Sequence, residues 1–302
     1  MVVSRLYRPQ TLSETLHLLR EHGDQVHPEY PQAVACSVAP AGATPLGIDT
    51  SRLSERNGIH QFGGRLLIGL NMTLAELARS SLVRSQATCL QEACAYLPLV
   101  ADKPLALAFA GLPASLNAPP PDFWPPLVAL LALDAEVELA WLGASERVEQ
   151  ILVPLAELSS ETFPQPVLPL AVSFPVTDSM GGSAFVPVPA TPGMAPTPLA
   201  AAVRLAFAAD AQTVASARIA LVSPAGAPAR VPSAEDCLQG RPLDPESIGA
   251  AAQGAQHFAL AQWPATSTAR SYPIQLAAHL VRTALDRAAA RARDTASDAT
   301  PF

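Results

Sequence analysis

The segment that most constrains the fold of this chain runs from Phe109 to Pro126 and reads FAGLPASLNAPPPDFWPP. Its prolines fix φ and remove amide donors, so the stretch is typical of a loop or of extended backbone. It continues directly into LVALLALDAEVELA. The valines and leucines of residues 137–142 and 147–153 then predict paired strands, and we expect these strands to end a first domain.

The composition is that of a globular chain rich in loops. A length of 302 residues allows two domains, and 49% apolar against 15% charged residues excludes a disordered chain. The 31 prolines are about twice the usual share. A net charge of −7 argues against a nucleic-acid partner, and no apolar run is long enough to span a membrane. The start MVVSRLYRPQ lacks signal-peptide features, so we expect a cytoplasmic protein, with export of a folded complex on a partner's signal left open.

The cysteines and histidines form no catalytic or metal-binding pattern. Four cysteines are too few and too scattered for a disulfide framework, so we interpret them as ordinary buried thiols. The histidines show no ligand spacing, and no carboxylate pair or Ser/His/Asp order accompanies them. We therefore expect neither catalytic residues nor a metal site on this chain. The residues concerned are Cys36, Cys89, Cys94, Cys237, His17, His22, His27, His60, His257 and His279.

Local signals predict several elements. Thr11 with Glu14, and Thr73 with Glu76, form capping boxes that open two helices, the second over residues 74–79. A Gly-Gly pair at residues 63–64 predicts a hairpin into a strand over residues 66–70. Apolar patterns predict further strands over residues 34–38, 203–208 and 217–222, and helices over residues 86–97, 247–255 and 274–290.

Several motifs stand in a fixed order along the chain. They are LYRPQTLSETLHLLREHG, GIDTSRLSERNGI, RLLIGLNMTLAELARS, the loop ending in DFWPP with its LALDAEV continuation, ARIALVSPAGAPARVPSAEDCLQG, and residues 267–285. Together they resemble the medium, FAD-binding subunit of the molybdenum hydroxylases, the family of xanthine dehydrogenase, carbon monoxide dehydrogenase and aldehyde oxidoreductase.

The resemblance implies an α+β fold in two parts. A two-subdomain FAD-binding module of the PCMH type would occupy residues 1–165, and a Pro/Gly-rich connection residues 166–198. A small antiparallel sheet with helices would form the C-terminal domain over residues 199–290. A polar tail would follow over residues 291–302.

The family binds the FAD diphosphate on two glycine-rich turns, whose backbone amides point into one anion-binding concavity. The first turn normally reads A-G-G-T-D, and its nearest match here is Ala41-Gly42-Ala43-Thr44-Pro45. Ala43 adds a Cβ where the family has a glycine, and Pro45 removes an amide donor. The resemblance therefore places a weakened phosphate turn at Gly42, Ala43 and Thr44.

The second turn is normally T-x-G-G-N, followed by P-x-x-D. Laid on without gaps, its threonine falls on Phe109, its glycines on Gly111 and Leu112, and its asparagine on Pro113. Leu112 would put an aliphatic side chain where backbone must approach phosphate, and Pro113 deletes two donors. Asp122 matches the aspartate that contacts the cofactor, although it could equally cap a turn.

Other positions leave two interpretations open. Thr73 matches a threonine near the flavin, yet its capping box also explains it. Phe123 and Trp124 could stack on a ring or pack in a core. Lys103 could contact a phosphate or lie on the surface. The family's basic F-x-K-x-x-R-R segment is AFVPVPA at residues 184–190, with no basic residue.

Energetics favour a chain that has lost tight flavin binding. Hydrogen bonds to a charged group contribute about 1.5–3 kcal/mol each, so losing about three would weaken binding by roughly three to six orders of magnitude. The first hypothesis is therefore a structural, docking subunit, not itself catalytic, beside an iron–sulfur small subunit and a molybdopterin large subunit. Electrons would then leave a partner's [2Fe–2S] cluster directly for a carrier such as a cytochrome.

The alternative hypothesis is a working electron-transfer subunit. FAD would be held by Gly42, Thr44, Gly111 and Asp122, and would pass electrons from the [2Fe–2S] clusters to NAD or another acceptor. The substrate of such a complex would lie on another chain.

Overall fold

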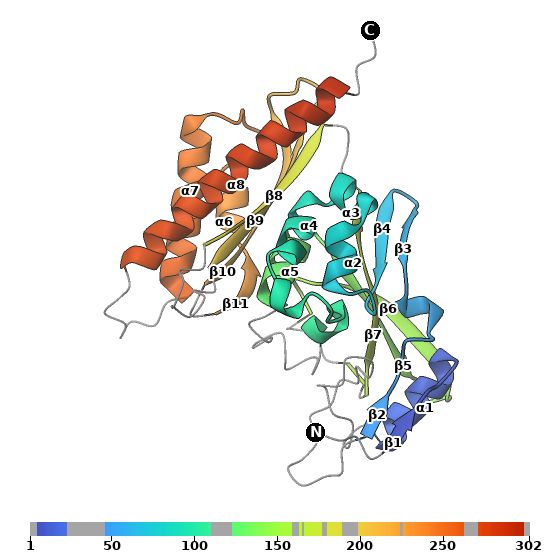
Figure 1. The fold of residues 1–302 in the computed structure, drawn as a ribbon. Helices are drawn as coiled ribbons and strands as arrows, with labels where there is room; N and C mark the ends of the chain where they lie inside the picture. Colours follow the sequence, from blue (N-terminus) through green and yellow to red (C-terminus); the bar gives the residue numbers. More distant parts are fainter. Residues whose placement is uncertain are drawn as a thin grey trace. The chain divides into compact units, whose positions relative to one another are not determined.

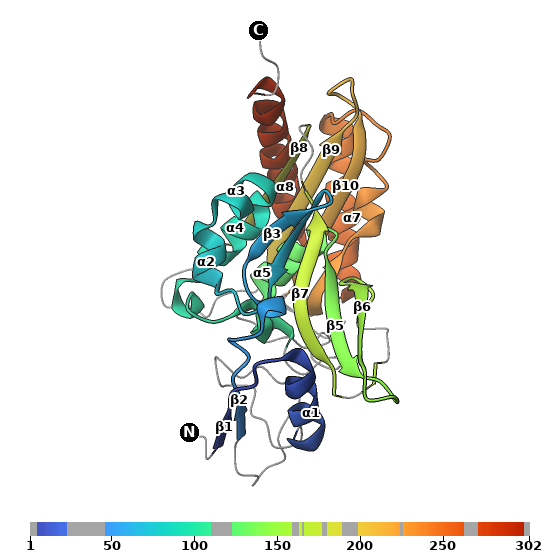
Figure 2. The ribbon, with the colours of Figure 1, turned by 90° about the vertical axis from the view of Figure 1, so that its right-hand side faces the viewer.

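The computed structural model describes residues 5–22, 46–109, 123–158, 163–164, 166–176, 180–188, 199–223, 226–262 and 271–298. The chain divides into two compact units, and each is built from segments that are not continuous in sequence (Figures 1 and 2). The N-terminal unit comprises Met1–Leu77, Pro98–Phe123 and Ala135–Pro175. The C-terminal unit comprises Ala78–Leu97, Trp124–Asp134 and Val176–Phe302.

The main sheet of the N-terminal unit has five antiparallel strands. Their spatial order is β3 (Ile59–Phe62), β4 (Arg65–Gly69), β7 (Leu168–Pro175), β5 (Glu136–Leu142) and β6 (Val148–Pro154). Gly63 and Gly64 both have positive φ and make the two-residue turn between β3 and β4. Such a turn needs left-handed backbone at both positions, which is why the Gly-Gly pair correctly predicted this hairpin.

A smaller layer precedes that sheet. Strand β1 (Arg5–Tyr7) pairs in parallel with β2 (Leu46–Ile48), and α1 (Leu12–His22) packs against β5 and β6. The N-cap of α1 is confirmed, because the amide of Glu14 donates to Thr11 Oγ1 at 3.2 Å; Glu14 Oε2 in turn accepts from the amide of Gln10, one residue before the cap, at 2.8 Å. Short helical segments η2 (Ser54–Arg56), η3 (Pro98–Val100) and η4 (Leu105–Phe109) and helix α2 (Leu74–Arg79) complete the described elements of this half.

The C-terminal unit is built on a four-stranded antiparallel sheet. Its order is β11 (Gly226–Arg230), β10 (Val214–Ser223), β9 (Ala200–Phe207) and β8 (Gly181–Pro187). Its helices are α3 (Ser81–Gln86), α4 (Thr88–Ala95), α5 (Trp124–Ala132), α6 (Pro232–Glu235), α7 (Pro245–Gln262) and α8 (Ser271–Asp298).

Helices cover both faces of this sheet. On one face, Ala201, Val203 and Leu205 of β9 share a core with α6, α7 and α8. Successive side chains of a strand point to opposite faces, and Arg204 of the same strand donates to the carbonyl of Leu133, just after α5. Helices α4 and α5 therefore lie on the other face, where they contact β8 to β11 (Figure 1).

The observed elements differ from the expected ones mainly at their ends. The helix expected over residues 86–97 is α4 (Thr88–Ala95). It begins after Ala87, whose φ of −151° and ψ of 57° break the helical backbone and separate α4 from α3. The connection expected over residues 166–198 contains the whole of β7 and β8. The tail expected from Arg291 is helical as far as Asp298. The strand expected over residues 34–38 lies outside the described residues.

The mixture of helices with antiparallel sheets confirms the predicted α+β class. Helices α3, α4 and α5 belong to the C-terminal unit although they fall within residues 1–165. The linear boundaries drawn from the sequence stay a prediction. Among the described helices, none is both long and apolar enough to cross a membrane.

Candidate functional site

Most residues of the two predicted phosphate turns lie outside the described part of the chain. This applies to Gly42, Ala43, Thr44 and Pro45 in the first turn, and to Gly111, Leu112, Pro113 and Asp122 in the second. The structure does describe Thr73 and the residues at which the second loop begins and ends. The environment of these residues shows what the backbone on either side of the loop can offer a ligand.

Thr73 is engaged in its own capping box. Its hydroxyl donates to Glu76 Oε2 at 2.8 Å, and its amide donates to the same oxygen at 2.7 Å. In return, the amide of Glu76 donates to Thr73 Oγ1 at 3.2 Å. This is the reciprocal arrangement that the sequence predicted. A flavin contact by Thr73 stays a prediction.

The other amides at the start of α2 are also used within the protein. Leu74 N donates to the carbonyl of Lys103 at 3.1 Å, and Ala75 N donates to that of Ala101 at 2.7 Å. The backbone of residues 101–103 thus occupies the positions where an anion would meet a helix N-terminus. Lys103 contributes its carbonyl to this contact, and its side chain is half-buried.

The second loop follows η4, the last described element before it. Leu105 N donates to the carbonyl of Met72, and Ala106 N donates to that of Leu70, which holds η4 against the end of β4. Phe109 closes η4 with 0% of its surface exposed. A buried aromatic ring therefore stands where the resemblance places a polar threonine.

The second loop ends at Phe123, which is 2% exposed. Its ring is buried, so it packs in the protein interior, one of the two alternatives left open by the sequence. Trp124 begins α5 and is half-buried. Pro125 and Pro126 occupy the first turn of this helix, where a missing amide costs no intrahelical hydrogen bond.

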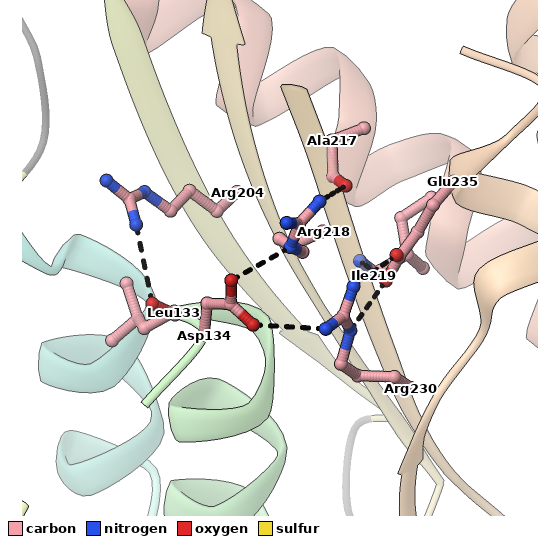
Figure 3. A network of polar contacts seen from close by, with 8 residues as sticks. All are labelled: Leu133, Asp134, Arg204, Ala217, Arg218, Ile219, Arg230 and Glu235. Carbon is pink, nitrogen blue, oxygen red and sulfur yellow. Dashed lines mark hydrogen bonds and ion pairs between the residues drawn. The ribbon is translucent and has the colours of Figure 1, made fainter. Parts of the chain in front are cut away.

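A polar network fixes the end of α5, and it was not found from the sequence (Figure 3). Asp134 accepts from Arg218 Nε at 3.2 Å and from Arg230 Nη1 at 3.0 Å. Arg204 donates to the carbonyls of Leu133 at 3.3 Å and Val176 at 2.9 Å. The signal was present, since Asp134 stands in LALDA and Arg218 in ARIALV, two of the motifs that carry the resemblance.

The cysteines that the structure describes are free and serve no visible chemistry. Cys89 and Cys94 are buried, as predicted, and Cys237 is half-buried. Burial raises the pKa of the Cys89 thiol to about 12 and raises the pKa of Cys94 as well, so neither supplies a thiolate at neutral pH. Among the described residues no group of three or more metal-ligating side chains comes together.

Known proteins share both the C-terminal part and the overall fold. Residues 192–288 match the family model of the CO dehydrogenase flavoprotein C-terminal domain. A chain of carbon monoxide dehydrogenase from Hydrogenophaga pseudoflava superposes with a TM-score of 0.73 at 22% identity, covering 96% of this chain and 99% of that one. Reconstituted CO dehydrogenase from Oligotropha carboxidovorans gives a TM-score of 0.74 at 21% identity, covering 96% of this chain and 100% of that one.

Quinoline 2-oxidoreductase from Pseudomonas putida 86 has a similar chain, with a TM-score of 0.68 at 19% identity, covering 97% of this chain and 98% of that one. No curated protein sequence matches this chain significantly. The class defined by these matches is a subunit fold shared by CO dehydrogenase and quinoline 2-oxidoreductase. Residues 192–288 match the model of the CO dehydrogenase flavoprotein C-terminal domain, and the matched structures confirm the resemblance to the medium subunit of molybdenum hydroxylases at the level of the fold.

Proposed function

We propose that this chain is the medium subunit of a molybdenum hydroxylase and that it has lost tight FAD binding. It would serve as a structural, docking subunit beside an iron–sulfur small subunit and a molybdopterin large subunit. The observation that carries the proposal is the buried ring of Phe109 at the start of the second phosphate turn, where the family has a polar residue. We place the complex in the cytoplasm.

The sequence of both turns supports the same conclusion. Ala43 and Leu112 stand at glycine positions, and Pro45 and Pro113 supply no amide. The neighbouring helix N-terminus offers no replacement, because the amides of residues 73–76 already have partners within the N-terminal unit. We expect FAD to dissociate with a Kd in the micromolar to millimolar range, from roughly 4–9 kcal/mol of lost binding.

Electron flow would change accordingly. A reduced [2Fe–2S] cluster of the small subunit would pass one electron at a time to an external carrier such as a cytochrome. The cluster is reoxidised and the carrier reduced in each step. FAD on this chain would take no part.

A second candidate function is a working flavin subunit that transfers electrons from the [2Fe–2S] clusters to NAD or another acceptor. The observation in its favour is the extent of the fold, which covers 96% of this chain in its match to the CO dehydrogenase of Hydrogenophaga pseudoflava. Gly42, Thr44, Gly111 and Asp122 would then hold a more weakly bound FAD.

The flavin content of the complex, purified from its native source, separates these two functions. We expect well under one FAD per chain after denaturation and no flavin bands that bleach with substrate. One FAD per chain, reducible by substrate, would overturn the proposal.

A variant provides the reverse test. Restoring the family residues with Ala43→Gly, Leu112→Gly and Pro113→Asn together should raise the affinity for added FAD at least about 100-fold. The matched control is Leu99→Gly, which removes a leucine side chain that is 94% exposed and should leave FAD affinity unchanged. Equal, tight binding by the unaltered chain and the restored variant would count against the proposal.

A further inference from the structure

Three arginines lie on the face of the C-terminal sheet that carries α5. Arg218 of β10 pairs directly with Arg204 of β9, and Arg230 of β11 pairs with Ala220 of β10. Like charges directly opposite each other destabilise a sheet, the more so when partly buried. The side chains of Arg218 and Arg230 are only 30% and 21% exposed. The positive charges of these three arginines therefore have to be balanced by a carboxylate close to the strands.

Asp134 supplies that charge from an unusual backbone conformation. Its φ of 58° lies in the left-handed region, where a helix commonly ends with glycine because a side chain is disfavoured there. The carboxylate uses one oxygen for Arg218 and the other for Arg230. A single residue at the end of α5 thus joins two neighbouring strands.

The remaining charges are accounted for locally. Buried Glu235 accepts from Nε and Nη2 of Arg230 and from the amide of Ile219, so it fixes one side of this guanidinium. Arg204 donates to the carbonyl of Leu133, where its charge also complements the negative end of the helix dipole. Asp134 is the group whose side chain links Arg218 and Arg230 to the end of helix α5 (Figure 3).

We propose that Asp134 fixes the position of α5 on the C-terminal sheet through its two ion pairs, with Arg218 and Arg230; we call this arrangement the charge latch. The chain keeps aspartate at a position that favours glycine because its carboxylate must bridge Arg218 and Arg230. This inference concerns the packing of the C-terminal unit and does not depend on whether the chain binds flavin.

The test compares Asp134→Gly and Asp134→Asn in the full chain. Glycine relieves the left-handed backbone, whereas asparagine tolerates it, and both remove the charge. A latch predicts that both variants lower the Tm, by about 3–6 °C, and speed hydrogen exchange in α5 and β11 on the order of tenfold. The matched control is Ala211→Gly, an exposed position with a φ of 56° and no carboxylate, where the Tm should not fall.

A double-variant cycle tests the bridge itself. Asp134→Asn should lower the free energy of unfolding less in an Arg218→Gln background than in the unaltered chain. The reason is that Arg218, one of the two arginines paired with Asp134, then carries no charge that a carboxylate must balance. If Asp134→Gly is as stable as the unaltered chain, Asp134 merely ends the helix and the proposal is overturned. Full additivity of Asp134→Asn and Arg218→Gln would overturn it as well.

Discussion

At Gly182 the backbone of strand β8 lies close to the backbone of helix α8. A Cβ built at this glycine would stand 2.2 Å from the carbonyl oxygen of Ala288 and 2.8 Å from the amide nitrogen of Ala292. Neither is a flexible side-chain end, so the strand or the helix would have to move. The close approach is possible because α8 presents alanines, Ala288 and Ala292, at the contact.

We therefore expect Gly182→Ala to destabilise the chain by about 1–3 kcal/mol, the usual range for overpacking. Urea unfolding measures the change. Gly249→Ala is the matched control, because a Cβ there meets nothing within 4 Å and the position is helical. The control should stabilise the chain by about 0.5–1 kcal/mol. Equal stability of the Gly182→Ala variant and the unaltered chain would show that β8 and α8 can move apart to admit a methyl group without loss of stability.

Strand β8 is one of the two edge strands of the four-stranded sheet in the C-terminal unit. A pair of side chains covers its free backbone groups. The amide of Phe185 donates to Glu92 Oε2 at 2.9 Å, and Arg291 donates to the carbonyl of Ser183 at 2.6 Å. Glu92 and Arg291 also form an ion pair. Helices α4 and α8 thus close an edge that could otherwise pair with another chain.

Replacing both residues, Glu92→Ala with Arg291→Ala, should open this edge. We expect a loss of about 1–2 kcal/mol, reduced by the partial exposure of the pair, and concentration-dependent self-association in sedimentation velocity. Arg20→Ala is the control, since it breaks an Arg–Glu pair whose side chains are 42% and 60% exposed and which covers no strand edge. A monomeric double variant would contradict this role.

At the scale of helices and strands, the sequence correctly predicted features that depend on residues close together in the chain. The N-cap at Thr11, the capping box at Thr73 and the Gly-Gly hairpin follow from short-range geometry and were correct. The end of α8 was missed because Arg291 is held by Glu92, about 200 positions away, and helix periodicity carries no such information. Within the candidate site, no local pattern indicated that Phe109 is buried. Asp134 and Arg218 stand in recognisable motifs, but their pairing joins positions 84 residues apart, which the motifs alone do not indicate.

Across the whole molecule, segments that are neighbours in sequence belong to different structural units. The sheet of residues 181–230 is covered on one face by helices from residues 232–298. Its other face is covered by α4 and α5, which precede it in sequence. No linear boundary separates the C-terminal unit from the rest, because Pro98–Phe123 and Ala135–Pro175 belong to the N-terminal unit.

Native-state hydrogen exchange in low denaturant tests this grouping. Amides of α4 and α5 should open with the same free energy as those of β9 and β10, because elements of one cooperative unit exchange together. Amides of β4 and β7 serve as the reference for the N-terminal unit. Exchange of α5 in step with β4 and β7 would mean that the helix belongs, energetically, to the other unit.

The dispersed origin of the C-terminal unit limits how this protein can be recombined. A gene fragment for residues 192–288, the stretch matched by the family model, would lack strand β8 and the helices that cover one face of the sheet. Chimeras with a related subunit should therefore succeed only when the donor also supplies β8 and the two helical stretches at residues 78–97 and 124–134. An exchange of this domain between related subunits would therefore have to carry three separate stretches of the gene.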